Sequence, residues 1–236
     1  KAYDIRGIVG QALTEEVVCA VGRVLGSMAI ERGADSFCVG RDGRLTGESL
    51  EAALIRGISG AGLRVIDIGA VPTPVLHFAT KHFGNGTGCA VTGSHNPPEY
   101  NGLKMMVAGI TLSGEEIQGI RKRIEEGRWL SSAAPAQVDK ADVLPAYIKK
   151  ALDGIQISRR LKVICDAGNG IAGPVMLRLL KALDVEAVPL YCEPDGHFPH
   201  HHPDPSKPKN LQDLIVKVKE TGADYGFALD GDGDRL

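Results

Sequence analysis

Apolar residues along this chain come in short blocks separated by polar or glycine-containing turns, and the blocks show two different spacings. Short apolar runs bounded by turn residues are typical of buried strands. Between them, apolar positions recur every three or four residues, which is typical of helices with one buried face. Such alternation predicts a largely parallel sheet covered by helices on both faces. In the first half, the expected strands are 37–40, 63–68, 88–91 and 104–107, and the expected helices are 15–32, 48–61, 73–82 and 114–126.

Two of these helices carry clear N-terminal signals. Thr14 precedes Glu15 and Glu16, so a hydroxyl can cap the helix while two carboxylates face the positive end of its dipole. Ser113 and Glu116 have the spacing of a capping box, in which each side chain accepts a hydrogen bond from the other residue's backbone. These signals predict where the two helices begin.

The second half of the chain repeats the plan of the first. A connector rich in Ser, Ala and Pro lies between the halves at 131–136. We therefore expect an α/β protein with two tandem α/β/α domains and mixed, largely parallel sheets, at residues 1–140 and 141–236. In the second domain, the expected strands are 161–165, 185–188 and 225–229, and the expected helices are 175–180 and 211–221, the latter capped by Asn210.

Three polar loops have interpretations that need no ligand. Arg41 and Arg44 could meet a phosphate, but a solvated loop is the simpler prediction. The glycine-rich stretch 166–170 lacks the full glycine spacing of a dinucleotide fingerprint. Adjacent histidines at 200–202 cannot all face one ion, so we expect a loop packed between the domains rather than a metal site.

Composition narrows the class of protein. The 236 residues are 43% hydrophobic and the net charge is −2, which is typical of a globular protein and gives no electrostatic case for nucleic acid. No apolar run approaches the roughly 20 residues needed to span a bilayer, so we expect no membrane segment. The five scattered cysteines fit buried or free thiols in a reducing cytoplasm.

The loop at residues 92–98 is the first candidate for chemistry. Gly93 breaks the expected strand 88–91, and the proline pair at 97–98 prevents a helix or ladder from continuing. Ser94 is therefore expected on a stiff, exposed loop beside the imidazole of His95. Open α/β sheets place ligands at the carboxyl ends of strands, which suits a reactive hydroxyl. The alternative is an ordinary Ser/Pro turn.

The second candidate is an acidic loop near the end of the chain. Asp230, Asp232 and Asp234 alternate with glycines, which favours a tight turn that brings the three carboxylates together. Like charges about 4 Å apart repel by about 4 kcal/mol at an effective dielectric constant of about 20. A cation among them would remove this cost, and an all-oxygen set suits Mg²⁺, Mn²⁺ or Ca²⁺. The alternative is a solvated acidic turn.

Three strings of residues together carry a family resemblance. They are AYDIRG at 2–7, TGSHNPP at 92–98 followed by NGLK at 101–104, and DGDGDR at 230–235. In this order the chain resembles the α-D-phosphohexomutases, most closely the bacterial phosphomannomutase/phosphoglucomutase branch. The resemblance covers the whole chain, which is similar to the first two of the four family domains, so we expect it to be a fragment without domains III and IV.

The resemblance implies a phosphoserine and a metal ion. Ser94 would carry the phosphoryl group, and its phosphate oxygen would complete the shell of one Mg²⁺ held by Asp230, Asp232 and Asp234. It also implies a hexose phosphate substrate, with glucose 1,6-bisphosphate as the activator. The activity implied is that of an intramolecular phosphotransferase, which interconverts hexose 1-phosphate and 6-phosphate of mannose or glucose.

Further site residues are implied by the same resemblance. Arg6 and Tyr3 would reach the active site and bind substrate, although both lie near the beginning of the chain. Lys104 and Arg235 would stabilise the negative charge that spreads over the transferring phosphoryl group. His95 is a candidate proton shuttle or phosphate contact. The base for the sugar hydroxyl remains open among His95, Lys104 and Arg6.

Three other functions compete with this interpretation. Asp-x-Asp-x-Asp begins like a calcium loop, but Arg235 stands where the loop glycine belongs. A phosphoglucosamine mutase would use the same residues on a different sugar. A non-catalytic or phosphatase-like relative would keep Ser94 only as a structural residue.

Overall fold

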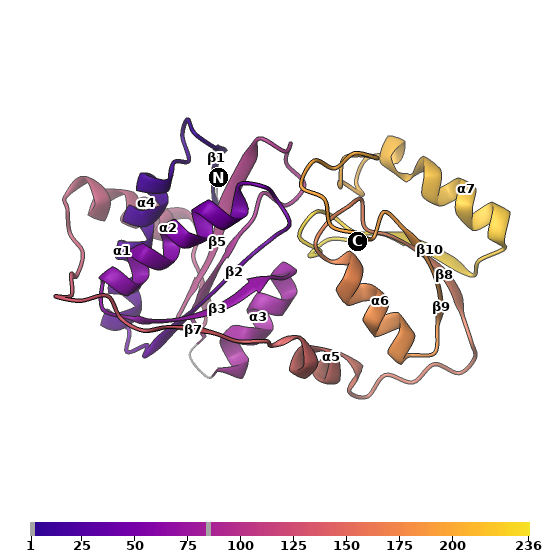
Figure 1. Ribbon diagram of the computed structural model, residues 1–236, viewed down its shortest axis with the longest axis horizontal. Coiled ribbons are helices and arrows are strands. Elements are labelled where there is room, and N and C mark those ends of the chain that lie inside the picture. Colours follow the sequence, from indigo (N-terminus) through magenta and orange to yellow (C-terminus); the bar gives the residue numbers. More distant parts are fainter. Residues whose placement is uncertain (1–2, 84–85) are drawn as a thin grey trace.

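A seven-stranded mixed sheet organises the first half of the chain in the computed structural model, which describes residues 3–83 and 86–236 (Figure 1). Strands β2, β3, β4 and β7 run parallel to one another, whereas β5 runs antiparallel to its two neighbours, β1 and β4. In spatial order the strands are β1 (Ile5–Ile8), β5 (Tyr100–Val107), β4 (Gly88–Val91), β2 (Ser36–Arg41), β3 (Arg64–Ala70) and β7 (Val138–Lys140), and β6 (Ile110–Thr111) pairs with β5.

Helices cover both faces of this sheet because side chains alternate along its strands. On β2, Phe37 and Val39 point into one hydrophobic cluster, whereas Cys38 points into the other. The first cluster contains residues of α1 (Glu15–Glu31), α2 (Gly47–Gly60) and α4 (Gly114–Glu125). The second contains residues of α3 (Thr73–His82) and α5 (Leu144–Leu152).

A smaller parallel sheet organises the second half in the same way. Ile164 of β8 packs beneath α7, while Cys165 packs beneath α6 on the opposite face. The elements are β8 (Lys162–Asp166), α6 (Gly173–Ala182), β9 (Glu186–Leu190), the 3₁₀ turn η1 (Pro208–Leu211), α7 (Gln212–Thr221) and β10 (Tyr225–Ala228), with strand order β10-β8-β9.

The two sheets form separate lobes whose loops meet between them (Figure 1). The helix α5 links the lobes because it packs against α3 of the first and α6 of the second. At the meeting point, the Thr73 amide of the first lobe donates to the Asp232 carbonyl oxygen of the second at 2.9 Å. Within the described ranges, no helix has both the length and the apolar character that crossing a membrane requires.

The predicted fold class is confirmed, with differences in detail. The Thr14 cap and the Ser113–Glu116 capping box are both present. Lys104 is not at the start of its strand, because β5 already begins at Tyr100 through pairing with β1. Asn210 does not cap α7, since its side chain donates to the Asp204 carbonyl oxygen at 2.9 Å. The edge strand β7 was missed because its residues form no apolar run.

Glu51 is a buried acid in the first lobe, between α2 and the sheet. Its Oε2 accepts a hydrogen bond from Arg41 Nε at 3.0 Å, while its buried Oε1 has no hydrogen-bond partner among the described residues. Burial, together with the charge of Asp67, raises the pKa of Glu51 from 4.5 to about 7. The folded protein therefore holds a proton at this site over a pH range in which the unfolded chain has released it.

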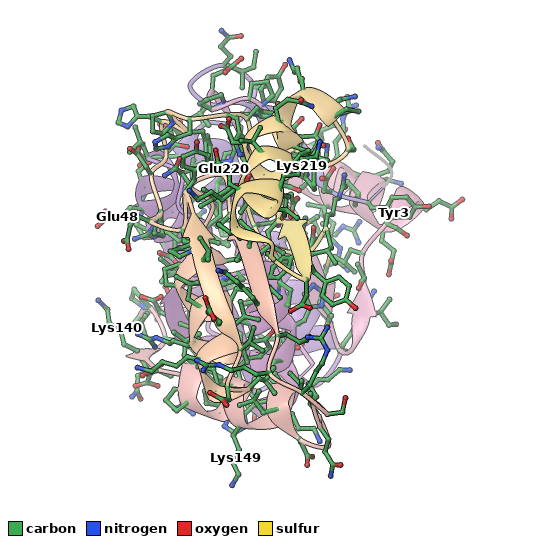
Figure 2. The ribbon with its side chains drawn as sticks, turned by 90° about the vertical axis from the view of Figure 1, so that its right-hand side faces the viewer. Tyr3, Glu48, Lys140, Lys149, Lys219 and Glu220 are labelled. Carbon is green, nitrogen blue, oxygen red and sulfur yellow. The ribbon has the colours of Figure 1, made fainter. Side chains whose placement is uncertain are left out.

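Because the folded protein binds this proton more tightly than the unfolded chain does, we expect its contribution to the free energy of unfolding to fall as pH rises. The stabilisation is complete below the ordinary pKa of 4.5 and is lost as pH rises through about 7. Glu51→Gln should flatten this slope. The difference in the free energy of unfolding between the variant and wild type should be on the order of 2 kcal/mol more favourable to the variant at a pH above the raised pKa than at a pH below the ordinary one. Urea unfolding at several pH values between the two pKa values and on either side of them measures the slope. Glu48→Gln, on the same helix but pointing to solvent (Figure 2), should keep most of the wild-type slope, because its charge makes only the smallest contribution to the raised pKa of Glu51. An unchanged slope in Glu51→Gln would contradict the prediction.

Candidate active site

The Ser94 loop follows β4 at the carboxyl edge of the first sheet, as the sequence predicts. Ser94 itself adopts a φ of 51°, a strained backbone conformation for a residue with a Cβ. The predicted exposure is wrong, because Ser94 is fully buried. The acidic loop of the second lobe covers it so closely that a Cβ on Gly231 would lie 2.5 Å from the Ser94 carbonyl oxygen. Only glycine permits this approach.

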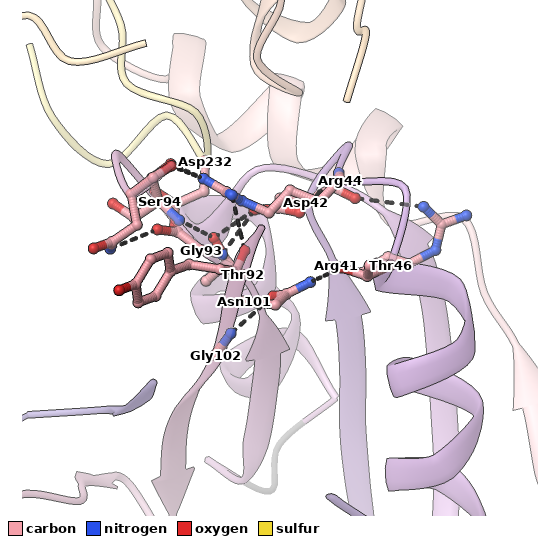
Figure 3. A network of polar contacts seen from close by, with 12 residues as sticks. Arg41, Asp42, Arg44, Thr46, Thr92, Gly93, Ser94, Asn101, Gly102 and Asp232 are labelled. Carbon is pink, nitrogen blue, oxygen red and sulfur yellow. Dashed lines mark hydrogen bonds and ion pairs between the residues drawn. The ribbon is translucent and has the colours of Figure 1, made fainter. Parts of the chain in front are cut away.

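Asp42 supports the Ser94 loop from the neighbouring strand end. This buried carboxylate accepts hydrogen bonds from Thr92 Oγ1 at 2.8 Å and from the Gly93 amide at 3.0 Å. Thr92 Oγ1 in turn accepts from the Ser94 amide at 2.9 Å. Figure 3 shows this network between the ends of the strands. The backbone on both sides of Ser94 is therefore held by side chains of the first lobe.

Arg44 fills the inside of the same loop. The expectation of a solvated Arg44 is wrong, since the residue is 2% exposed and its Nε lies 3.3 Å from Asp42. A Cβ on Gly93 would lie 2.3 Å from the guanidinium, which leaves room only for glycine. The loop is therefore held together by hydrogen bonds to one planar guanidinium rather than by packed apolar side chains. Its Nη2 donates to the carbonyl oxygens of Ser94 (2.8 Å) and Asn96 (2.6 Å), and its Nη1 to those of Pro97 (2.6 Å) and Tyr100 (2.9 Å).

The acidic loop brings its three carboxylates together, as predicted. One oxygen each of Asp230, Asp232 and Asp234 lies within 4.8 Å of the others. Gly233 has a φ of 70°, and a Cβ there would lie 2.5 Å from Ala172 Cβ, so the turn requires glycine. Asp230 and Asp232 are fully buried, which increases the cost of leaving their charges unpaired.

The surroundings of Asp232 fit a cation. Its Oδ2 accepts hydrogen bonds from Thr73 Oγ1 at 2.6 Å and from Lys104 Nζ at 2.7 Å. Its Oδ1 is buried without a hydrogen-bond partner among the described residues. A buried carboxylate oxygen in this state is an available ligand for a divalent cation. Lys104 Nζ also donates to Asp234, so the loop already binds one positive charge.

The pKa values of the two buried carboxyls move apart. Burial raises the pKa of Asp230 to about 7, and the neighbouring charge of Asp232 adds to this rise. Burial acts in the same direction on Asp232, but the Lys104 ammonium and the hydrogen bonds outweigh it, so the pKa of Asp232 is below its usual value. The loop therefore keeps one carboxylate ionised and holds the other near its titration midpoint at neutral pH.

Ser94 and the acidic loop meet across the lobes. Ser94 Oγ donates a hydrogen bond to Asp230 Oδ2 at 2.6 Å, and His95 Nδ1 lies 3.2 Å from the same hydroxyl. The hydroxyl thus lies between a carboxylate of one lobe and an imidazole of the other. This arrangement suits a phosphoryl acceptor beside a cation site.

A cavity of about 460 Å³ opens beside this meeting point and collects most of the other predicted site residues. Arg6 is almost buried, with an ion pair to Asp4 and no hydrogen-bond partner for Nε among the described residues. Tyr3 is 73% exposed and extends from the side of the molecule (Figure 2). Ala2, at the start of the same string, lies outside the described residues. The predicted residues that line the cavity are Tyr3, Arg6, His95, Lys104, Asp234 and Arg235.

Sequence reasoning missed several residues of this site. Asp42, Arg44 and Thr73 hold the two reactive loops, and His77 of α3 lines the cavity. A signal for the first two was available: their loop follows β2, which is parallel to β4, so both loops lie at one edge of the sheet. Thr73 and His77 belong to a helix with an ordinary apolar pattern, which gave no such signal.

Comparison with known proteins gives consistent matches over both lobes. Residues 1–131 match the family described as phosphoglucomutase/phosphomannomutase, alpha/beta/alpha domain I, and residues 145–236 match its alpha/beta/alpha domain II. The whole chain is 50% identical to half of a phosphomannomutase/phosphoglucomutase from Pseudomonas aeruginosa and 45% identical to 51% of a phosphoglucomutase from Neisseria meningitidis serogroup B. The chain thus spans about half the length of the curated relatives it matches.

A solved structure extends the agreement to three dimensions. A phosphoglucomutase/phosphomannomutase family protein from Burkholderia thailandensis superimposes with a TM-score of 0.94 at 45% identity, covering 99% of this chain and 52% of that one. At this identity and TM-score, both lobes and their relative placement are alike in the two proteins.

Arg44 gives a direct test of how the Ser94 loop is held. Arg44→Lys keeps the positive charge but loses the planar fork, so several of the four carbonyl bonds cannot form. We expect a loss of about 3 kcal/mol in the free energy of unfolding, measured by urea titration. Arg56→Lys, which alters an exposed ion pair with Glu15, should cost less than about 1 kcal/mol. Equal losses in both variants would show that Arg44 has no special role.

Proposed function

Because the chain belongs to the phosphoglucomutase/phosphomannomutase family, we propose that it forms the phosphoryl-transfer half of a hexose phosphate mutase. The single observation that carries the proposal is the contact of Ser94 Oγ with Asp230 Oδ2 at 2.6 Å. It puts a hydroxyl nucleophile within reach of a cluster of carboxylates suited to a cation. Family membership also argues against the calcium-module interpretation.

The ion we propose is Mg²⁺, held by Asp230, Asp232 and Asp234. Few protein ligands, all carboxylate oxygens, are the usual arrangement for Mg²⁺ beside a phosphate. The buried, unpartnered Oδ1 of Asp232 supports a cation on this side of the loop. When bound, the ion would offset the carboxylate repulsion and withdraw charge from the phosphoryl group. We propose that Ser94, once phosphorylated, supplies a further oxygen ligand.

The residues of the chain divide the remaining work. In transfer, the bond between phosphorus and Ser94 Oγ breaks, and a new bond forms to a sugar hydroxyl oxygen, whose proton leaves to a base. Lys104 and Arg235 line the cavity and would stabilise the charge on the phosphoryl oxygens. His95 would exchange a proton with the Ser94 hydroxyl, and the 3.2 Å distance between His95 Nδ1 and Ser94 Oγ supports this role. Arg6 and Tyr3 line the same cavity and would contact the substrate.

The proposed reaction interconverts hexose 1-phosphate and 6-phosphate through a 1,6-bisphosphate. Glucose 1,6-bisphosphate would act as the activator because it can phosphorylate Ser94. The names of the relatives support mannose and glucose as the sugars. Since the relatives are about twice as long, we propose that domains III and IV of the family supply further sugar contacts and that this chain alone turns over poorly. The five free thiols support a reducing, cytoplasmic setting.

Metal binding tests the cation site by itself. Mg²⁺ should raise the thermal midpoint of the chain, since a ligand of the folded state stabilises it. Asp232→Asn removes a charge and a ligand and should weaken Mg²⁺ binding by at least about tenfold in calorimetry. Asp195→Asn, which alters an exposed carboxylate of the same lobe, should bind as wild type. A strong preference for Ca²⁺ over Mg²⁺ would instead favour a calcium module.

Phosphorylation of Ser94 tests the function. Incubated with Mg²⁺ and glucose 1,6-bisphosphate, the chain should gain one phosphoryl group by intact-mass spectrometry, and peptide mapping should place it on Ser94. Ser94→Ala should gain none, whereas Ser113→Ala, which removes a helix cap elsewhere, should gain one. An unmodified wild-type chain that still binds Mg²⁺ would mean that Ser94 is structural.

A further inference from the structure

A segment of the second lobe, residues 193–204, lies against both the loop that carries Arg44 and the Ser94 loop. We call it the clamp segment. A Cβ on Gly196 would lie 2.8 Å from the Gly43 carbonyl oxygen and 2.8 Å from the Leu45 amide, so the two backbones are in direct contact. The Phe198 ring centre lies 5.3 Å from the Arg44 guanidinium carbon. The clamp segment therefore covers the arginine that fills the Ser94 loop.

Phe198 occupies this position at a conformational cost. Its φ is 50°, which is an outlier for a bulky residue, and its side chain is nevertheless buried. Strain of this kind costs on the order of 1–3 kcal/mol and persists where surrounding contacts enforce it. Two contacts help to offset this cost: the Phe198 amide donates to the Asp195 carbonyl oxygen at 3.0 Å, and the ring lies against the Arg44 guanidinium, which is a favourable cation–π arrangement.

His202 makes the second contact between the clamp segment and the Ser94 loop. Its Nε2 lies 2.5 Å from the carbonyl oxygen of His95. A carbonyl oxygen only accepts hydrogen bonds, so Nε2 carries the proton and donates. The bond is made to the residue directly after Ser94. The prediction that this histidine-containing loop packs between the domains is confirmed by this contact of His202.

His201 anchors the clamp segment to its own lobe. Its Nδ1 lies 3.0 Å from the His202 carbonyl oxygen, and its Nε2 lies 3.0 Å from Oδ2 of the fully buried Asp166. Both partners accept hydrogen bonds, so both ring nitrogens donate. Asp166 belongs to β8, the central strand of the second sheet. A chain of polar contacts thus runs from this strand through His201 and His202 to the Ser94 loop.

From this chain of contacts we infer that His202 and Phe198 are positioning residues for Ser94. They hold the loop from the second lobe, while Arg44 holds it from the first, so that Ser94 Oγ stays within reach of Asp230. Asp166 and His201 fix the clamp segment that carries them. The catalytic part of this inference, that these contacts hold Ser94 ready for phosphoryl transfer, rests on the proposed function. The positioning of the loop is a property of the chain without ligands.

Hydrogen exchange of the ligand-free chain tests the positioning. His202→Leu removes the donor to the His95 carbonyl oxygen, and amide exchange at Gly93, Ser94 and Asn96 should become about tenfold faster. His202→Gln, whose amide can donate in place of Nε2, should restore slow exchange. The matched control is His197→Leu, in the same segment but exposed, which should exchange as wild type. Amides of β2 should not change in any variant.

The rate of Ser94 phosphorylation by glucose 1,6-bisphosphate gives the second readout. His202→Leu should lower the rate constant by about tenfold with an unchanged half-saturating concentration, and His202→Gln should recover it. Unchanged exchange in His202→Leu, or equal acceleration in the Ser94 loop and in β2, would overturn the inference. An unmodified wild-type chain with the expected exchange pattern would refute the proposed function and leave the positioning intact.

Discussion

Repulsion among the three converging carboxylates of the acidic loop is the constraint that the surrounding structure has to compensate. Asp230 and Asp232 are fully buried, and one oxygen of each lies within 4.8 Å of one of Asp234. Like charges at such separations cost several kcal/mol per pair, about a third of a small domain's stability or more. The first lobe supplies the compensation, with the Lys104 ammonium and the hydroxyls of Thr73 and Ser94 all donating to this loop. The acidic loop therefore depends on the neighbouring lobe, and a cation would complete its neutralisation.

The topology of the two sheets makes this compensation possible. In each lobe, parallel strands end at one edge and place their loops there, as β2 and β4 do in the first sheet and β8 and β10 in the second. The two edges face each other, so loops far apart in the sequence share one site (Figure 1). The strands themselves contribute few reactive groups. They act as a frame that sets the separation between hydroxyl and carboxylates.

Polar side chains hold the reactive loops where an apolar core cannot. A loop carries unpaired backbone groups, and burying them without partners is costly. Asp42 and Arg44 satisfy these groups behind Ser94, and Asp232 meets Thr73 on the other side. The same logic extends to the clamp segment, whose His202 binds the carbonyl oxygen after Ser94. Rigid positioning by hydrogen bonds is what phosphoryl transfer requires, since its catalysis is chiefly orientation and charge stabilisation.

Local chemistry determined much of this protein from its sequence alone. Apolar periodicity located most of the helices and strands, although it missed α5, β6 and β7. Glycine spacing predicted that the acidic loop folds onto one point. Both patterns are properties of residues that are close together in the sequence. Only the tertiary structure decided that Ser94 is buried, that Arg44 fills its loop and that Lys104 neutralises Asp232. The Arg44–Ser94 bond joins residues 50 apart and the Lys104–Asp232 bond joins residues 128 apart. Burial and charge pairing at such separations depend on how two lobes meet in space, and no local pattern along the chain encodes that meeting.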